Sequence, residues 1–209
     1  MKAERYSIDG KKLGTITLSD KIFSVFSDNF SKIQYEVVNT YLANQRVGSA
    51  SVKFRSEIHG SRRKLFRQKG TGNARVGDKK TIIRRGGGRA FGPKPKNWHK
   101  RIPKKVKRLS LKLALSQLAK VNGVCVIEDF TFSAPSTKKA KTILESVKTK
   151  ARKRLLIVDS SDKNIVKSFE NLEGIKLWRA DSLHSYLVLN SDCLILTDSA
   201  LKKVSEVFK

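Results

Sequence analysis

The second half of the chain alternates between short apolar runs and longer amphipathic stretches. The runs at 124–127, 155–158, 175–178 and 193–196 predict strands, and the stretches near 137–149, 162–172, 182–189 and 198–207 predict helices. Runs that are apolar throughout are typical of parallel strands covered on both faces. The pattern therefore predicts an α/β fold: a doubly wound, mostly parallel sheet with helices on both faces.

Two longer helices are predicted in the first half. One spans about 29–47; the other begins after Pro103, ends near Asn122 and Gly123, and carries an apolar stripe formed by Val106, Leu109, Leu113, Leu118 and Val121. Residues 13–18 have the pattern of an extended strand and predict a hairpin at the edge of the sheet.

Between these two helices, residues 49–102 have neither helical nor sustained strand periodicity. A loop of that length is unusual in a compact domain unless it has a function or a partner orders it. We therefore expect a globular α/β domain built from 1–48 and 103–209. A long basic, glycine-rich extended loop, 49–102, is inserted between its two helices.

Charge is concentrated in the same region. The chain holds 45 Lys and Arg against 18 Asp and Glu, a formal net charge of +27. Residues 53–108 hold 21 of these cations, only two acids (Glu57 and Asp78), and eight of the 13 glycines. Such a surface attracts polyanions. Because no apolar run approaches the roughly 20 residues of a membrane span, we expect nucleic acid and no membrane partner.

Catalysis and cofactor binding have little support in the sequence. The run Gly70-Thr71-Gly72-Asn73-Ala74-Arg75 lacks the third glycine of a dinucleotide fingerprint, and the chain contains no phosphate-binding P-loop motif. The histidines, His59, His99 and His184, are scattered; a nuclease using His59 and His99 is the one enzyme left open. Cys125 and Cys193 lie in apolar runs and are expected to be buried, reduced thiols. We expect no enzyme, cofactor or metal.

RNA binding suits the basic segment better. Lys and Arg side chains can contact phosphates, and glycines let the backbone approach them closely. Three aromatic residues, Phe66, Phe91 and Trp98, can stack on unpaired bases or form a local cluster. The sequence lacks a helix-turn-helix, zinc finger or basic zipper for the DNA major groove. Extended arms favour folded RNA.

Three linked motifs carry a family resemblance. They are the run RQKGTGNARVG at 67–77, GGG at 86–88 followed by FGPKP at 91–95, and PKKVKRL at 103–109 leading into LALS at 113–116. Along essentially the whole chain the sequence resembles the bacterial form of the large-ribosomal-subunit protein four family. The resemblance implies a structural constituent of the large subunit, in the cytoplasm, that binds large-subunit ribosomal RNA and supports early assembly.

The resemblance also implies where the chain binds. The extended loop would reach the peptide exit tunnel with a tip formed by Gln68, Lys69, Gly70, Thr71 and Gly72. Departures from the family pattern at Phe66, Leu65, Asn73 and Val52 affect individual contacts. The candidate residues for ribosomal RNA binding are Lys53, Arg55, Arg62, Arg63, Lys64, Phe66, Arg67, Gln68, Lys69, Gly70, Thr71, Gly72, Arg75, Lys79, Lys80, Arg84, Arg85, Gly86, Gly87, Gly88, Arg89, Lys94, Lys96, Trp98, Arg101, Lys104, Lys105, Lys107 and Arg108.

The expected partners are large-subunit ribosomal RNA and neighbouring large-subunit ribosomal proteins, without a homo-oligomer. Some bacterial members of the family repress their own operon, so the messenger RNA of that operon is a further candidate partner. The alternative function is a free nucleic-acid-binding regulator of transcription or translation that is not built into a particle.

Overall fold

The structure is a computed structural model that describes residues 1–147, 151–159 and 162–208. The end of the helix expected at 137–149 lies outside the described residues. The chain forms two compact units, one from Met1–Leu42 with Arg101–Lys209 and one from Ala43–Lys100.

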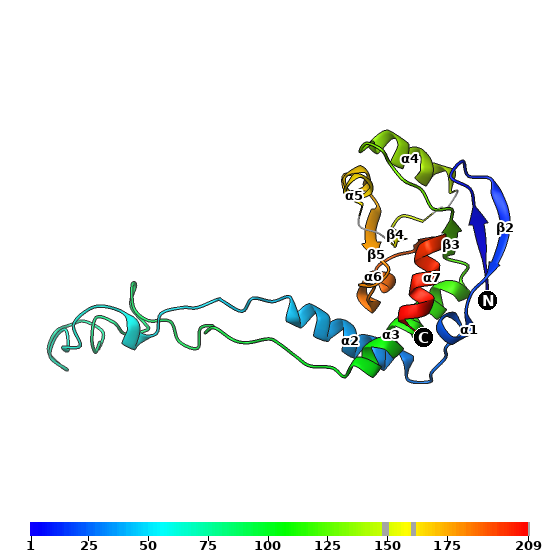
Figure 1. Cartoon of the computed structure of the whole chain (residues 1–209). Coiled ribbons are helices and arrows are strands. Elements are labelled where there is room, and N and C mark those ends of the chain that lie inside the picture. The colour runs from blue at the N-terminus through cyan, green and yellow to red at the C-terminus, as the bar shows by residue number, and fades with distance from the viewer. Residues whose placement is uncertain (148–150, 160–161, 209) are drawn as a thin grey trace. The chain divides into compact units, whose positions relative to one another are not determined.

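The first unit is built on a six-stranded sheet with the order β2-β1-β3-β6-β4-β5 (Figure 1). β1 and β2 form an antiparallel hairpin at one edge, and the remaining neighbours are parallel. The mostly parallel α/β fold and the edge hairpin are therefore confirmed. The strands are β1 (Lys2–Tyr6), β2 (Lys12–Thr17), β3 (Val124–Ile127), β4 (Arg154–Val158), β5 (Ile175–Arg179) and β6 (Cys193–Thr197).

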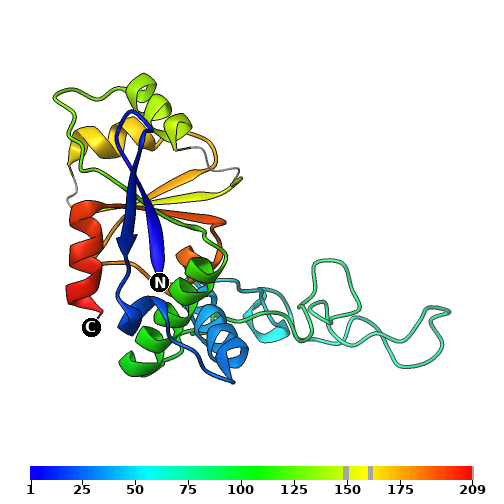
Figure 2. The same cartoon turned by 90° about the vertical axis from the view of Figure 1, so that its right-hand side faces the viewer.

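Helices cover both faces of this sheet (Figure 2). α4 and α5 pack on one face, and α1, α3, α6 and α7 contribute to the core on the other. For α4, α5 and α6 this division follows from right-handed crossovers, because the chain steps outward from β3 through β4 to β5 and then returns to β6. The helices are α1 (Asp20–Phe23), α2 (Phe30–Asn44), α3 (Lys104–Lys120), α4 (Thr137–Ser146), α5 (Lys163–Phe169), α6 (Ser185–Leu189) and α7 (Asp198–Val207).

Successive residues of the central strands enter two different cores. In β3, Val124 and Val126 join the core beneath α3 and α7, whereas Cys125 and Ile127 join the core beneath α4 and α5. This alternation explains why the strand sequences are apolar at every position. β5 is an edge strand and is less covered, with Trp178 37% exposed.

Two local features differ from expectation. α1 was not predicted, although it buries Ile22 and Phe23 completely. Val121, expected on the apolar stripe, is 71% exposed, because α3 instead buries Leu111 and its neighbours between α1 and α6. The predicted end of α3 is confirmed: Asn122 has a φ of 55°, and the Gly123 amide donates to the Leu118 carbonyl at 2.8 Å.

Both cysteines are buried, as expected, and neither is in a disulfide in the structure. A hydrogen bond with Cys193, together with burial, raises the pKa of the Cys125 thiol. In the described part of the chain no helix is long and apolar enough to cross a membrane. The same residues contain no cluster of His, Cys, Asp or Glu suited to a metal ion.

Candidate nucleic-acid interface

The second unit, Ala43–Lys100, is built from two antiparallel arms. We call 48–57 the outgoing arm and 88–100 the return arm; they run side by side in Figures 1 and 2. Three backbone hydrogen bonds join them: Lys96 to the Gly48 carbonyl (3.0 Å), Val52 to the Pro93 carbonyl (3.1 Å) and Arg89 to the Lys53 carbonyl (3.0 Å). The ladder is sparse because Pro93 and Pro95 have no N–H to donate. The one regular element wholly inside the unit is a short 3₁₀-helix, η1 (Arg55–Glu57).

Glycines let the arms approach closely. A Cβ on Gly92 would lie 2.0 Å from Cγ2 of Val52, and one on Gly88 would lie 2.3 Å from the backbone nitrogen of Arg55. Neither position has room for a side chain. Gly87 is packed in the same way against the Thr81 carbonyl, whereas Gly86 is exposed with a φ of 76°. The glycine cluster thus shapes the chain itself as well as any approach to phosphate.

The two acids of the basic segment hold the unit together. Glu57 accepts hydrogen bonds from the Lys94 ammonium at 2.7 Å and from the Phe54 amide at 2.9 Å. The Lys94 bond holds the pKa of the Glu57 carboxyl below its usual range. Asp78 is 4% exposed and accepts from Arg55 at 3.0 Å and from the Thr81 hydroxyl at 2.9 Å. The Thr81 hydrogen bond, with Arg55 close by, lowers its carboxyl pKa.

Most cations of the unit have no carboxylate partner among the described residues. Of the seventeen Lys and Arg residues in 43–100, two, Arg55 and Lys94, form ion pairs, which leaves fifteen without a carboxylate in the described part of the chain. Lys80 is buried. The remaining candidate cations here are exposed: Lys53, Arg62, Arg63, Lys64, Arg67, Lys69, Arg75, Lys79, Arg84, Arg85, Arg89 and Lys96. Cations this dense repel one another, and a bound polyanion reduces that repulsion.

A second group of candidate cations belongs to the first unit, at the start of α3. They are Arg101, Lys104, Lys105, Lys107 and Arg108, all of them exposed, and the first turn of α3 has no acid. Cations at a helix N-terminus face the positive end of the helix dipole, which destabilises the helix. This placement costs stability within the chain and suits binding to an external anion.

The expected tip is a closed loop. The Leu65 amide donates to the Gly77 carbonyl at 3.0 Å and joins the two ends of this loop. Gly70 and Gly72 reverse the chain with φ values of 77° and 70°, and the Arg67 guanidinium donates to the Gly70 carbonyl at 2.9 Å. Thr71 is half-buried, Gln68 accepts a hydrogen bond from Lys64, and Lys69 is exposed with no ion pair in the described residues.

The three aromatic residues singled out from the sequence differ sharply in exposure. Trp98 is half-buried, with the Arg46 guanidinium 5.0 Å and the Lys96 ammonium 4.6 Å from its ring centre. Phe66 is also half-buried. Phe91, by contrast, is 103% exposed. The candidate set taken from the sequence includes Phe66 and Trp98 and omits Phe91, because exposure cannot be read from residue type.

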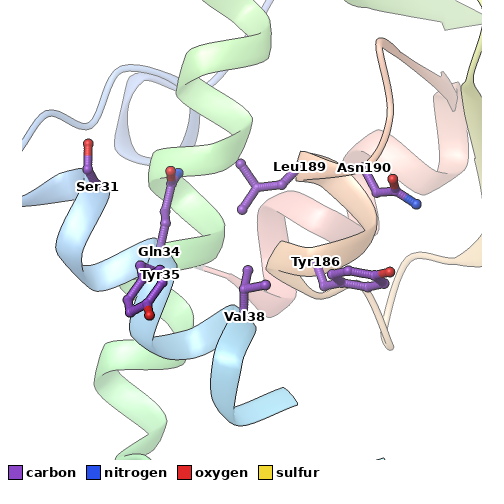
Figure 3. A pocket seen from close by; sticks show the side chains of 7 residues that line it. All are labelled: Ser31, Gln34, Tyr35, Val38, Tyr186, Leu189 and Asn190. Carbon is purple, nitrogen blue, oxygen red and sulfur yellow. The ribbon is translucent and has the colours of Figure 1, made fainter. Parts of the chain in front are cut away.

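The first unit has a surface hollow of a different character. It measures about 390 Å³ and is formed by Ser31, Gln34, Tyr35 and Val38 of α2 with Tyr186, Leu189 and Asn190 beside them (Figure 3). Gln34 also donates to Gln117 of α3 at 3.0 Å, which fixes α2 against the rest of the first unit. We call this first unit the body. Among the described residues no charged side chain lines the hollow, so it lies outside the cationic candidate interface.

Taken together, these features define an α/β protein whose chemistry is that of a cationic binding surface. Residues 16–207 match the model of the ribosomal protein L4/L1 family. Two similar proteins, each named large ribosomal subunit protein uL4, come from Parabacteroides distasonis (42% identical, 100% of both chains) and Syntrophomonas wolfei (38% identical, 99% of both chains). The chain belongs to the ribosomal protein L4/L1 family, whose members are structural, non-enzymatic components of the ribosome.

Proposed function

We propose that this protein is a constituent of the large ribosomal subunit that binds large-subunit ribosomal RNA through residues 43–108. The observation that carries the proposal is the set of fifteen Lys and Arg residues in 43–100 without a carboxylate partner in the described chain. A folded RNA supplies phosphates in number and at the spacing that extended arms can follow. The family and the names of its relatives agree with this role and with a location in the cytoplasmic ribosome.

The tip has a more specific proposed role. We expect residues 68–72 to reach the peptide exit tunnel, where Lys69 contributes a compact positive charge against an RNA wall. The loop is closed at its base and turned at Gly70 and Gly72, so it is shaped to enter a narrow space. The arms would bring distant RNA segments together, which is how the protein would support early assembly. Repression of its own operon by binding the messenger RNA is a further prediction.

Sedimentation of ribosomes separates this proposal from its alternative. If the chain is a subunit constituent, it co-sediments with the large subunit at one copy per particle and stays bound in dissociated subunits. A free regulator would remain at the top of the gradient or follow particles at a small fraction of one copy. The second result would overturn the proposal.

The contact with RNA can be tested separately by its dependence on salt. Each phosphate that a cation neutralises releases counterions, and contributes about −0.9 to the log–log slope on duplex DNA and about −0.7 on single strands. If about eight cations of 43–108 contact phosphates, affinity for purified large-subunit ribosomal RNA falls with a slope of about −5 to −7. A slope shallower than about −2 would mean that these residues are not the binding surface.

A further inference from the structure

Phe91 combines two unfavourable features at one position. Its side chain is 103% exposed, so the whole ring is in contact with solvent. Its φ is 47°, in the left-handed region that is uncommon for residues other than glycine and strained for bulky ones. Among the described residues no other ring and no cation contacts the Phe91 ring. Within the described part of the chain, no ring or cation contact compensates for the exposure or for the strain.

The strained conformation is fixed by the arms on both sides. Two residues before Phe91, the Arg89 amide donates to Lys53; two residues after it, the Pro93 carbonyl accepts from Val52. The next residue, Gly92, lies directly against Val52, with no room for a side chain. Strained backbone persists where the surrounding structure determines it, and it concentrates at binding sites. The outgoing arm therefore holds the return arm in a shape that presents the Phe91 ring to solvent.

The charge that precedes Phe91 in the sequence indicates which class of partner the ring contacts. Arg84, Arg85 and Arg89 precede it and are exposed without a carboxylate in the described chain. An apolar protein partner would have to bury these guanidinium groups without counter-charges, which is costly. A nucleotide supplies both matching parts: a phosphate for a guanidinium and a flat base for the ring.

We propose that Phe91 is a stacking site for one unpaired base of large-subunit ribosomal RNA, held out by the paired arms and flanked by arginines that contact the adjacent phosphates. This inference rests on the proposed function and adds a ligand to it, namely an unpaired nucleobase at a defined position. It also separates Phe91 from Trp98, since the Trp98 ring already interacts with Arg46 and Lys96.

The first test compares full-length variants for binding to purified large-subunit ribosomal RNA over a range of salt. Loss of one stacked base costs about 5- to 150-fold in affinity, so Phe91→Ala and Phe91→Leu weaken binding by that factor, and Phe91→Tyr stays close to the parent protein. The salt slope is unchanged in all variants, because no phosphate contact is removed. Ile83→Ala is the matched control, since Ile83 is an apolar residue of the same unit that is 81% exposed.

A further variant, Phe91→Gly, removes the ring and the backbone strain together. If the ring is what binds, the glycine variant loses as much affinity as the alanine variant. Affinity equal to that of the parent protein in the glycine, alanine or leucine variant would overturn the proposal, even if the salt slope stayed steep. A shallow slope in the parent protein would instead overturn the proposed function, so the two failures are distinguishable.

The second test places a photoreactive benzoylphenylalanine at position 91 and irradiates assembled large subunits. The expected product is a crosslink to ribosomal RNA at one site, in a segment that is unpaired. A crosslink to a neighbouring protein, or the absence of any crosslink to RNA, would overturn the stacking site.

Discussion

The carboxylate of Glu57 accepts a hydrogen bond at 2.7 Å from the ammonium of Lys94, 37 residues further along the chain. The same ammonium lies 4.1 Å from the centre of the Phe54 ring. One acid in a strongly basic segment thus joins the outgoing arm to the return arm. We interpret the paired arms as a scaffold that keeps many cations in a fixed arrangement, ready for the proposed RNA partner.

Replacing this acid should loosen the arms without affecting the body. In Glu57→Gln, the amides of Val52 and Arg89, which donate across the arms, should exchange hydrogen faster by a factor of about 1.5 to 5, the range of a partly exposed ion pair. Hydrogen exchange read by NMR measures these amides directly. Glu145→Gln is the matched control, because it removes an exposed pair with Lys141 in α4. Unchanged exchange at both amides would show that the pair does not hold the arms.

The arms approach each other very closely where Gly92 packs against Val52. In Gly92→Ala the new Cβ overlaps Cγ2 of Val52, an overlap that typically costs about 1–3 kcal/mol and should part the arms. Affinity for large-subunit ribosomal RNA should fall, and the double variant Val52→Ala with Gly92→Ala should recover most of the loss. Gly77→Ala is the control, since the atom nearest its Cβ is 3.8 Å away. Failure of the second substitution to restore binding would refute this account of Gly92.

The body should lose stability in mild acid through His184. This imidazole stacks on Tyr186, is tilted against Tyr41 and meets Trp178 edge-on. Burial lowers its pKa below the usual value near 6.5. The unfolded state therefore binds the proton more readily, so this stability is present above about pH 6.5 and is lost as pH falls through the folded pKa. His184→Phe should flatten the melting temperature between pH 7 and pH 5. His59→Gln, at an exposed histidine, should leave the pH profile of the parent protein unchanged.

The tip prediction concerns Lys69. Lys69→Glu reverses one exposed charge and removes no ion pair in the described chain, so the fold should survive and subunit yield should fall only slightly. Chemical reactivity of tunnel-wall nucleotides and sensitivity to antibiotics that bind in the tunnel should change more than yield does. If both remain as in the parent ribosome, the tip lies elsewhere.

Much of the body was predictable from the sequence. The runs at Val124–Ile127 and Cys193–Thr197 are buried at every position, and short runs of this kind between helical stretches predict central parallel strands. α1 was not predicted because its four residues, Asp20–Phe23, are too few to show a helical period. The helix is recognisable only from its packing against α3.

The candidate interface was predictable in composition and not in arrangement. Charge and glycine content identify the segment. Its arms, however, pair through only three scattered backbone hydrogen bonds around Pro93 and Pro95, so the sequence shows no alternation of apolar and polar residues that would predict the pairing. The roles of Gly88 and Gly92 as points of close approach depend on residues up to 40 positions away in sequence. The exposure of Phe91 depends on a backbone angle fixed by those same contacts.

The central claim, that residues 43–108 are the RNA-binding surface, is tested most directly by ultraviolet crosslinking of intact large subunits followed by mass spectrometry of this chain. The account predicts that peptides crosslinked to ribosomal RNA come predominantly from 43–108. It further predicts that the neutral hollow between Tyr35 and Leu189 yields none. Crosslinks spread evenly over the α/β body, or centred on that hollow with residues 43–108 unlabelled, would contradict it.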